Sequence, residues 1–257
     1  MDSMQRGNPH TNPSTISVLA AWAAIAAVAA AVALLFSLHR LSPEYSPAWR
    51  MISEYANGEY GWVLGLMFIA YGASSLALAV ALASQLKRRH GRFGTGLVLL
   101  VLSGMAQASA AQFDLNQAVP HEVAGVVGIL SLPLAAILIS PSLAATAGSQ
   151  RAQKLILLAA NLTWISIVVW VASFLLMIAT FLHALGGLPA APPEKLPAGV
   201  IAVVGWTNRL MILSAWCWVA TVARHIIRLR GRTRQASPDT SLRAVRGAMD
   251  RARPRAG

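Results

Sequence analysis

Six long apolar runs divide the chain, and they constrain its fold more than any other feature of the sequence. A helix needs about 20 predominantly apolar residues to cross the ~30 Å hydrocarbon core of a bilayer. Only helices and closed barrels can cross it, and continuous runs of this length indicate helices. The six runs are Ile16–Leu38, Gly61–Ser84, Phe93–Phe113, His121–Ser140, Leu155–Leu185 and Gly199–Ala223.

The composition indicates the same class of protein. The 257 residues are 56% hydrophobic and only 12% charged, values that soluble domains of this length rarely combine. We therefore predict an all-α fold, a polytopic bundle of six transmembrane helices over residues 16–223. A disordered lead (1–15) precedes it and a basic tail (224–257) follows it. Cleavage of the first run as a signal peptide is the alternative, but its 23 residues exceed the ~7–15-residue core of such peptides.

Lysine and arginine are distributed unequally between the two sides of the expected bundle. Of the 21 such residues, 17 lie on the side of the two termini, ten of them in the tail. Because cytoplasmic loops carry the excess of basic residues, both termini are predicted to be cytoplasmic. The sequence thus predicts a multi-pass protein of the plasma (inner) membrane.

The same distribution limits the partners. The net charge of +12 comes from basic residues in short segments between apolar runs and in the tail, a distribution that argues against nucleic acid. We expect the lipid bilayer itself as partner, with anionic lipids drawn to the tail by ~1 kcal/mol per basic residue. The single cysteine, Cys217, excludes a disulfide within the chain and a thiolate metal site. No cofactor is expected, since no known phosphate-binding or nucleophile motif is present, and the sequence sets no oligomeric state.

One cation lies near the middle of the sixth run. An arginine at the centre of a membrane helix costs ~2.5–3.5 kcal/mol on insertion scales, so Arg209 is expected to face protein or a wet cavity and to have a partner. Asn208 precedes it and shares its polar character. The predicted topology puts three acidic candidates on the outer side, in the order Asp114, Glu54 and Glu122.

Two further features point to the same outer half. In the third run, Gln107 lies on a stripe with Ser103 and Asp114, and its buried amide is expected to find a hydrogen-bond partner. That stripe either joins helices or lines a polar cavity. In the first outer loop, Ser46–Pro47 is typical of a helix start and Gly58 of a helix end. We predict a short amphipathic helix between them, lying on the membrane surface.

These motifs resemble the DUF998 family, a large group of mainly prokaryotic six-span membrane proteins of unknown function. The resemblance extends over roughly residues 16–224 and implies the architecture and the positions of a site, but no activity. One departure is the pair Tyr55-Ala56, where the family has Leu-Gly after its Ser-Glu pair. The resemblance depends on Tyr45-Ser46-Pro47, Ile52-Ser53-Glu54, Phe113-Asp114, His121 and Asn208-Arg209.

Three functions fit these residues. The first is an outward-facing polar pocket that binds a lipid headgroup or a small anion at Arg209. The second is a structural role in which the polar residues only fix helix packing. The third is a metal-dependent hydrolase using His39, His121 and His183, although their spacing matches no known ligand motif. A binding or structural role is favoured over an enzyme. The predicted pocket is formed by Arg209, Asn208, Asp114, His121, Glu54, Ser53 and Gln107.

Overall fold

Six long helices make up the fold. The computed structural model describes residues 14–85, 91–113, 116–187, 193 and 195–251, with side chains described as far as residue 231. Within these ranges the chain is all-α, and six helices are long and apolar enough to cross a membrane, which confirms the predicted fold class. The helices are α1 (Thr15–Leu41), α2 (Gly61–Ala83), α3 (Arg92–Ala110), α4 (Ala118–Ala145), α5 (Gln150–Leu185) and α6 (Val204–Arg251).

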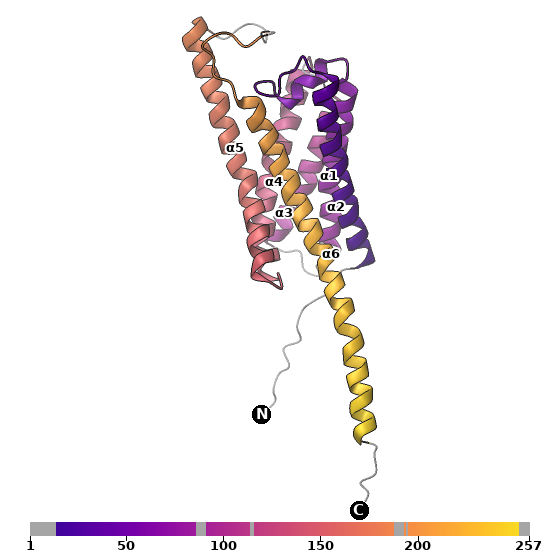
Figure 1. Ribbon diagram of the computed structural model, residues 1–257. Coiled ribbons are helices and arrows are strands. Elements are labelled where there is room, and N and C mark those ends of the chain that lie inside the picture. Colours follow the sequence, from indigo (N-terminus) through magenta and orange to yellow (C-terminus); the bar gives the residue numbers. More distant parts are fainter. Residues whose placement is uncertain (1–13, 86–90, 114–115, 188–192, 194, 252–257) are drawn as a thin grey trace, which may run out of the picture.

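The helices form a closed ring. Each helix packs against its neighbours in sequence, and α6 returns to pack against α1, while it also contacts α2 and α4 across the middle (Figure 1). At one end of the ring, Nη2 of Arg230 donates a hydrogen bond of 3.1 Å to Oγ1 of Thr15. The start of α1 and the end of the apolar part of α6 therefore lie together, as six crossings require. We call this the basic end and the opposite end the outer end; that the basic end is cytoplasmic stays a prediction.

Small residues let the helices approach closely. α1 buries a row of alanines against the bundle, including Ala21, Ala24 and Ala31. Between α2 and α3, a Cβ at Gly72 would lie 2.4 Å from the carbonyl oxygen of Gly104, so only glycine allows this contact. The packing explains how alanine-rich and glycine-containing runs bring neighbouring helices close together.

The middle of the bundle is filled by aromatic side chains of α6. Trp216 packs edge-on against Tyr71 of α2, with ring centroids 5.6 Å apart. The buried indole of Trp218 donates a hydrogen bond of 2.9 Å to Oγ of Ser140 in α4. These contacts fill the centre of the ring between the outer half and the basic end.

Two helices run further than we expected. α4 continues through Pro133 and Pro141 to Ala145, although its apolar run was expected to end near Ser140. A proline removes only its own N–H from the helix, and packing against neighbouring helices tolerates that loss. α6 continues beyond the bundle to Arg251, into the segment that we expected to form only a basic tail (Figure 1).

The connection between α1 and α2, residues 42–60, forms the outer loop. It contains one 3₁₀ helix, η1 (Ile52–Asn57), which Gly58 ends as predicted. The predicted start at Ser46–Pro47 is wrong, because that dipeptide forms a turn in which the N–H of Arg50 reaches the Ser46 carbonyl. The predicted surface position is also wrong. Ile52 and Tyr55 are buried against the bundle, so the loop covers the outer end of the ring.

Candidate functional site

Arg209 is buried in the outer half of the bundle, and neutral groups satisfy it. Its side chain is 4% exposed. Nε donates to Nε2 of His39 at 2.7 Å, and Nη1 donates to the carbonyl oxygens of Arg50 and Gly205 at 2.8 and 2.9 Å. Nη2 donates to the hydroxyl of Tyr55 at 3.2 Å. Four of the five N–H groups of a guanidinium are therefore engaged by the protein.

His39 can accept this hydrogen bond only as a neutral ring. Its Nδ1 lies 2.7 Å from the carbonyl oxygen of Leu35, which has no proton to give, so Nδ1 carries the ring's hydrogen. Nε2 is then left with a lone pair directed at Arg209. Both ring nitrogens are in use, and the tautomer follows from the two partners.

Tyr55 connects Arg209 to the backbone of the outer loop. Its hydroxyl accepts from Arg209 and donates to the carbonyl oxygen of Tyr45 at 3.1 Å. Burial raises the pKa of Tyr55 above its usual value, and the charge of Arg209 partly opposes that shift. The phenol therefore stays protonated at neutral pH and can make both hydrogen bonds.

The first turns of α6 hold the outer loop by two more contacts. Oδ1 of Asn208 accepts the backbone N–H of Ile52 at 3.0 Å, at the start of η1. The N–H of Gly205 donates to the carbonyl oxygen of Ala48 at 3.1 Å. A Cβ at Gly205 would lie 2.4 Å from the carbonyl oxygen of Pro47, so the loop backbone crosses α6 where only glycine fits. We call the contacts of Gly205, Asn208 and Arg209 with the loop and His39 the clasp.

The predicted carboxylate partner of Arg209 is not found among the described residues. Asp114 lies outside them. Glu54 instead forms a salt bridge of 2.6 Å with Nη1 of Arg50 and accepts the N–H of Met51 at 2.7 Å. Glu122 is exposed at the start of α4 and does not reach Arg209. Carbonyl dipoles and neutral acceptors replace the expected ion pair, which avoids the desolvation of a second charge.

Arg50 joins the two outer connections. Besides its salt bridge to Glu54, its Nη2 donates to the carbonyl oxygen of Pro193 at 2.6 Å, between α5 and α6. Its guanidinium also lies 4.1 Å from the ring centre of Trp49. A second arginine, which no sequence motif singled out, thus helps to close the outer end.

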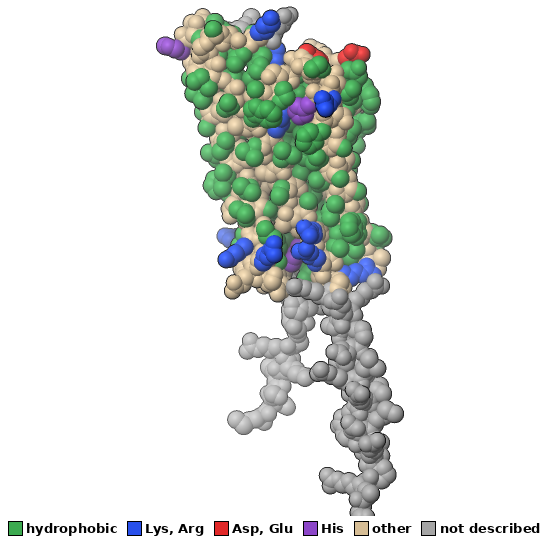
Figure 2. Space-filling view, viewed as in Figure 1, with side chains coloured by type: hydrophobic (Ala, Val, Ile, Leu, Met, Phe, Trp, Pro, Cys, Tyr) green, Lys and Arg blue, Asp and Glu red, His purple; other side chains and the backbone are tan. Residues whose placement is uncertain are grey.

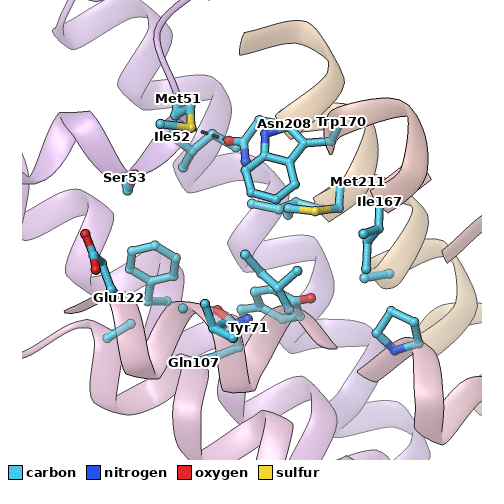
Figure 3. A pocket seen from close by; sticks show the side chains of 18 of the residues that line it. Met51, Ile52, Ser53, Tyr71, Gln107, Glu122, Ile167, Trp170, Asn208 and Met211 are labelled. Carbon is cyan, nitrogen blue, oxygen red and sulfur yellow. Dashed lines mark hydrogen bonds between the residues drawn. The ribbon is translucent and has the colours of Figure 1, made fainter. Parts of the chain in front are cut away.

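Below the outer loop lies a cavity of about 290 Å³, the outer cavity. Met51, Ile52 and Ser53 cover it, and the side chains of five helices, α2 to α6, line its walls. Most of the lining is apolar. Gln107 and Tyr71 lie close together on one side of the space, with Asn208 and Trp170 across from them (Figure 3).

Gln107 is a buried polar residue for which the described part of the chain provides no hydrogen-bond partner. It is 3% exposed, and its amide forms no hydrogen bond with any described residue, contrary to our expectation. Gly128 makes room for it, since a Cβ there would lie 2.4 Å from the amide nitrogen. The indole N–H of Trp170 is also buried without a partner in the described chain. Buried polar groups are normally satisfied, and both of these residues line the outer cavity.

The cavity brings together only some of the predicted pocket residues. Gln107, His121, Ser53 and Asn208 line it, whereas Arg209 and Glu54 do not.

Other lining residues were missed from the sequence: Tyr71, Thr163 and Trp170. The sequence contained a signal for Thr163 and Trp170. Each lies three residues before a serine, Ser166 and Ser173 respectively, so these residues share one side of α5. Those serines bond to α6, through Ser214 and Thr207 at 2.7 and 2.5 Å. A polar stripe that joins two helices thus also marks one edge of the cavity.

Two of the three histidines proposed as metal ligands form hydrogen bonds, and the third is exposed. Both nitrogens of His39 are bonded, and Nδ1 of His121 lies 2.9 Å from the carbonyl oxygen of Phe113. His183 is exposed on α5. The described residues contain no group of three or more His, Cys, Asp or Glu that could hold a metal ion. The described part of the chain therefore offers no support for the third function considered, a metal-dependent hydrolase.

Fold and site together define a six-span membrane protein with a roofed cavity in its outer half. The chain belongs to the family described as Protein of unknown function (DUF998), whose model matches residues 24–225. This confirms the resemblance stated from the sequence motifs, and the matched segment contains the clasp and the outer cavity. No curated protein and no solved structure matches the chain significantly.

The His39–Arg209 bond predicts a dependence of stability on pH. The folded protein needs the neutral ring, whereas an unfolded chain protonates its histidines below pH ~6.5. The unfolded state then binds more protons, so stability falls as the pH drops below that value, by up to ~1.4 kcal/mol per pH unit. The thermal midpoint in detergent, measured from pH 8 to pH 5, tests this expectation. His39→Gln keeps an acceptor and should flatten the curve, whereas exposed His183→Gln should leave it unchanged.

Proposed function

We propose that this protein binds a small, mainly apolar molecule from the bilayer in the outer cavity. The observation that supports this most directly is Gln107, a buried amide that faces the cavity without a partner. The site has the usual character of a ligand pocket, an apolar wall with a few converging polar groups. A ligand with one hydrogen-bonding group would satisfy Gln107 and the hydroxyl of Tyr71, and its apolar part would fill the rest.

The position of the exposed lining residues favours entry from the lipid. Two lining residues are exposed, Glu122 and Val126, and they lie one turn apart on α4. Ile167 and Trp170 of α5, which lines the cavity beside α4, are partly exposed. The mouth therefore faces the side of the bundle between α4 and α5, while the clasped outer loop covers the end. A membrane-resident ligand can enter through such an opening without crossing water.

Charge at the site argues against the small anion considered from the sequence. No described lysine or arginine lines the outer cavity, and its one charged lining residue is the acidic Glu122. Arg209 has four protein acceptors and lies outside the lining. The proposed ligand is thus a lipid whose polar group is neutral or positively charged.

Filling the cavity tests the proposal. Gly125 lines it, and a Cβ added there would have nothing within 4 Å, so Gly125→Leu should fold normally and fill the site. We expect mass spectrometry of lipids retained through purification to show at least a tenfold loss of the species held by the wild type. Gln107→Leu should lower retention while raising the stability of the empty protein. Lipid-facing Val123→Leu is the matched control, and equal retention in all variants would contradict the proposal.

A structural role is the second candidate, and the clasp favours it. The clasp holds the outer loop in place through Gly205, Asn208 and Arg209. A protein that functions in assembly would need such a fixed loop. The two functions are separable in cells, because Gly125→Leu fills the cavity and leaves the clasp intact. A phenotype from Gly125→Leu supports binding, and a phenotype from clasp variants alone supports the structural role. In either case we place the protein in the plasma membrane with the basic end cytoplasmic.

A further inference from the structure

A second cavity lies at the basic end, between the start of α5 and the last apolar turns of α6. Its volume is about 570 Å³, and we call it the basic groove. Arg224 and Arg228, one turn apart on α6, line it from one side. Ser149 and Leu155, at the start of α5, line it from the other. Lysine and arginine side chains gather at this end of the molecule on the face that Figure 2 shows.

The positive charges around the groove are not balanced by the described part of the chain. Arg151 and Lys154 stand beside it on the first turns of α5, which contain no acidic residue. The one described salt bridge, Arg50–Glu54, is at the outer end. Every acidic side chain that the structure describes also belongs to the outer half: Glu44, Glu54, Glu59 and Glu122.

This arrangement concentrates positive charge on both sides of the groove and so favours an anion there. Cations near a helix N-terminus oppose the helix dipole, and α5 carries two of its own while facing two arginines of α6. All four side chains repel one another. Arg224 and Arg228 are exposed and can turn their guanidinium groups into the groove. Paired guanidinium groups are well suited to the oxygens of a phosphate, which they bind bidentately.

The apolar part of the wall identifies the kind of anion. Leu155, Ile156 and Leu229 continue the lining beneath the charged residues, and Leu158 follows on the exposed face of α5. A soluble phosphate would leave this surface uncovered. We infer that the basic groove binds an anionic phospholipid, with its phosphate between Arg224 and Arg228 and its acyl chains along α5. This site is independent of the outer cavity and serves the leaflet at the basic end.

The experiment compares single charge removals in the full-length protein. Purified protein is mixed with phosphatidylglycerol or phosphatidylcholine in detergent, and bound lipid is counted by native mass spectrometry. Arg224→Gln and Arg228→Gln should each weaken phosphatidylglycerol binding about five- to tenfold, with phosphatidylcholine unaffected. Arg92→Gln removes an exposed charge at the same end, outside the groove, and should change binding less than twofold.

Three outcomes would overturn the inference. Unchanged phosphatidylglycerol binding in Arg224→Gln and Arg228→Gln removes the site. Equal weakening by Arg92→Gln shows only a diffuse basic surface. Full displacement of the lipid by inorganic phosphate at millimolar concentration shows a site for soluble anions. The thermal midpoint of each variant is measured alongside, and Arg224→Lys, which keeps the charge, should retain more lipid than Arg224→Gln if the protein remains folded.

Discussion

Replacing Arg209 by methionine is expected to lower the free energy of unfolding by ~3–5 kcal/mol, since each buried acceptor left without a donor costs about 1–3 kcal/mol. The change removes the donors that satisfy Nε2 of His39, the carbonyl oxygen of Arg50 and the hydroxyl of Tyr55, and leaves these acceptors buried. Arg209→Lys keeps the charge but cannot reach all the acceptors, so an intermediate loss is expected. Unfolding in detergent, followed by circular dichroism, measures the effect.

The control for this experiment is Arg40→Met. Arg40 is an exposed arginine one residue after His39, and its removal should change stability by no more than ~0.5 kcal/mol. The Arg209 variants should also make the outer loop sensitive to protease at temperatures where the bundle stays helical. If Arg209→Met is as stable as the wild type and its loop equally resistant, the clasp does not hold the loop.

Gly205→Ala is expected to destabilise the protein by about 2–4 kcal/mol. The added Cβ would lie 2.4 Å from the carbonyl oxygen of Pro47 and 2.7 Å from that of Arg50. Both are backbone atoms, so the outer loop must lift from α6. That movement would also break the hydrogen bond from the N–H of Ile52 to Asn208. The thermal midpoint of the purified variant checks this result.

A matched substitution separates the steric effect from the general effect of replacing glycine in a helix. Gly125→Ala adds the same methyl group to a membrane helix where nothing lies within 4 Å of it. Alanine favours the helix by up to ~1 kcal/mol over glycine, so this variant should be unchanged or slightly more stable. Equal stability changes at the two positions would show that the crossing of the loop over α6 carries no steric constraint.

The bundle was predictable from the sequence because its signal is local. Six apolar runs predict six helices, since each must satisfy its own backbone inside a membrane. The ends were less predictable, because hydropathy does not record that packing carries α4 past Pro141. The burial of Arg209 also followed from local information, as a charge among apolar residues has few other places to lie.

The partners of Arg209 could not be predicted in the same way. A search for partners among acidic side chains overlooks backbone carbonyls, which every residue carries, and a neutral histidine, which has no charge. The partner residues His39 and Arg50 come from two different segments far from Arg209 in the chain. The outer cavity could not be predicted from the sequence for a similar reason. Gln107 was recognised as deep, but whether it meets a neighbour or an opening depends on the ring of helices around it.

The clasp ties together two residues that are 170 positions apart in the chain. Because synthesis proceeds from the N-terminus, the outer loop is made long before the residues of α6 that hold it. Until α6 is complete, the loop lacks its hydrogen bonds to Gly205, Asn208 and Arg209. A chain truncated before Gly205 lacks these contacts, so its outer loop is expected to be cut by protease more readily than that of the full-length protein.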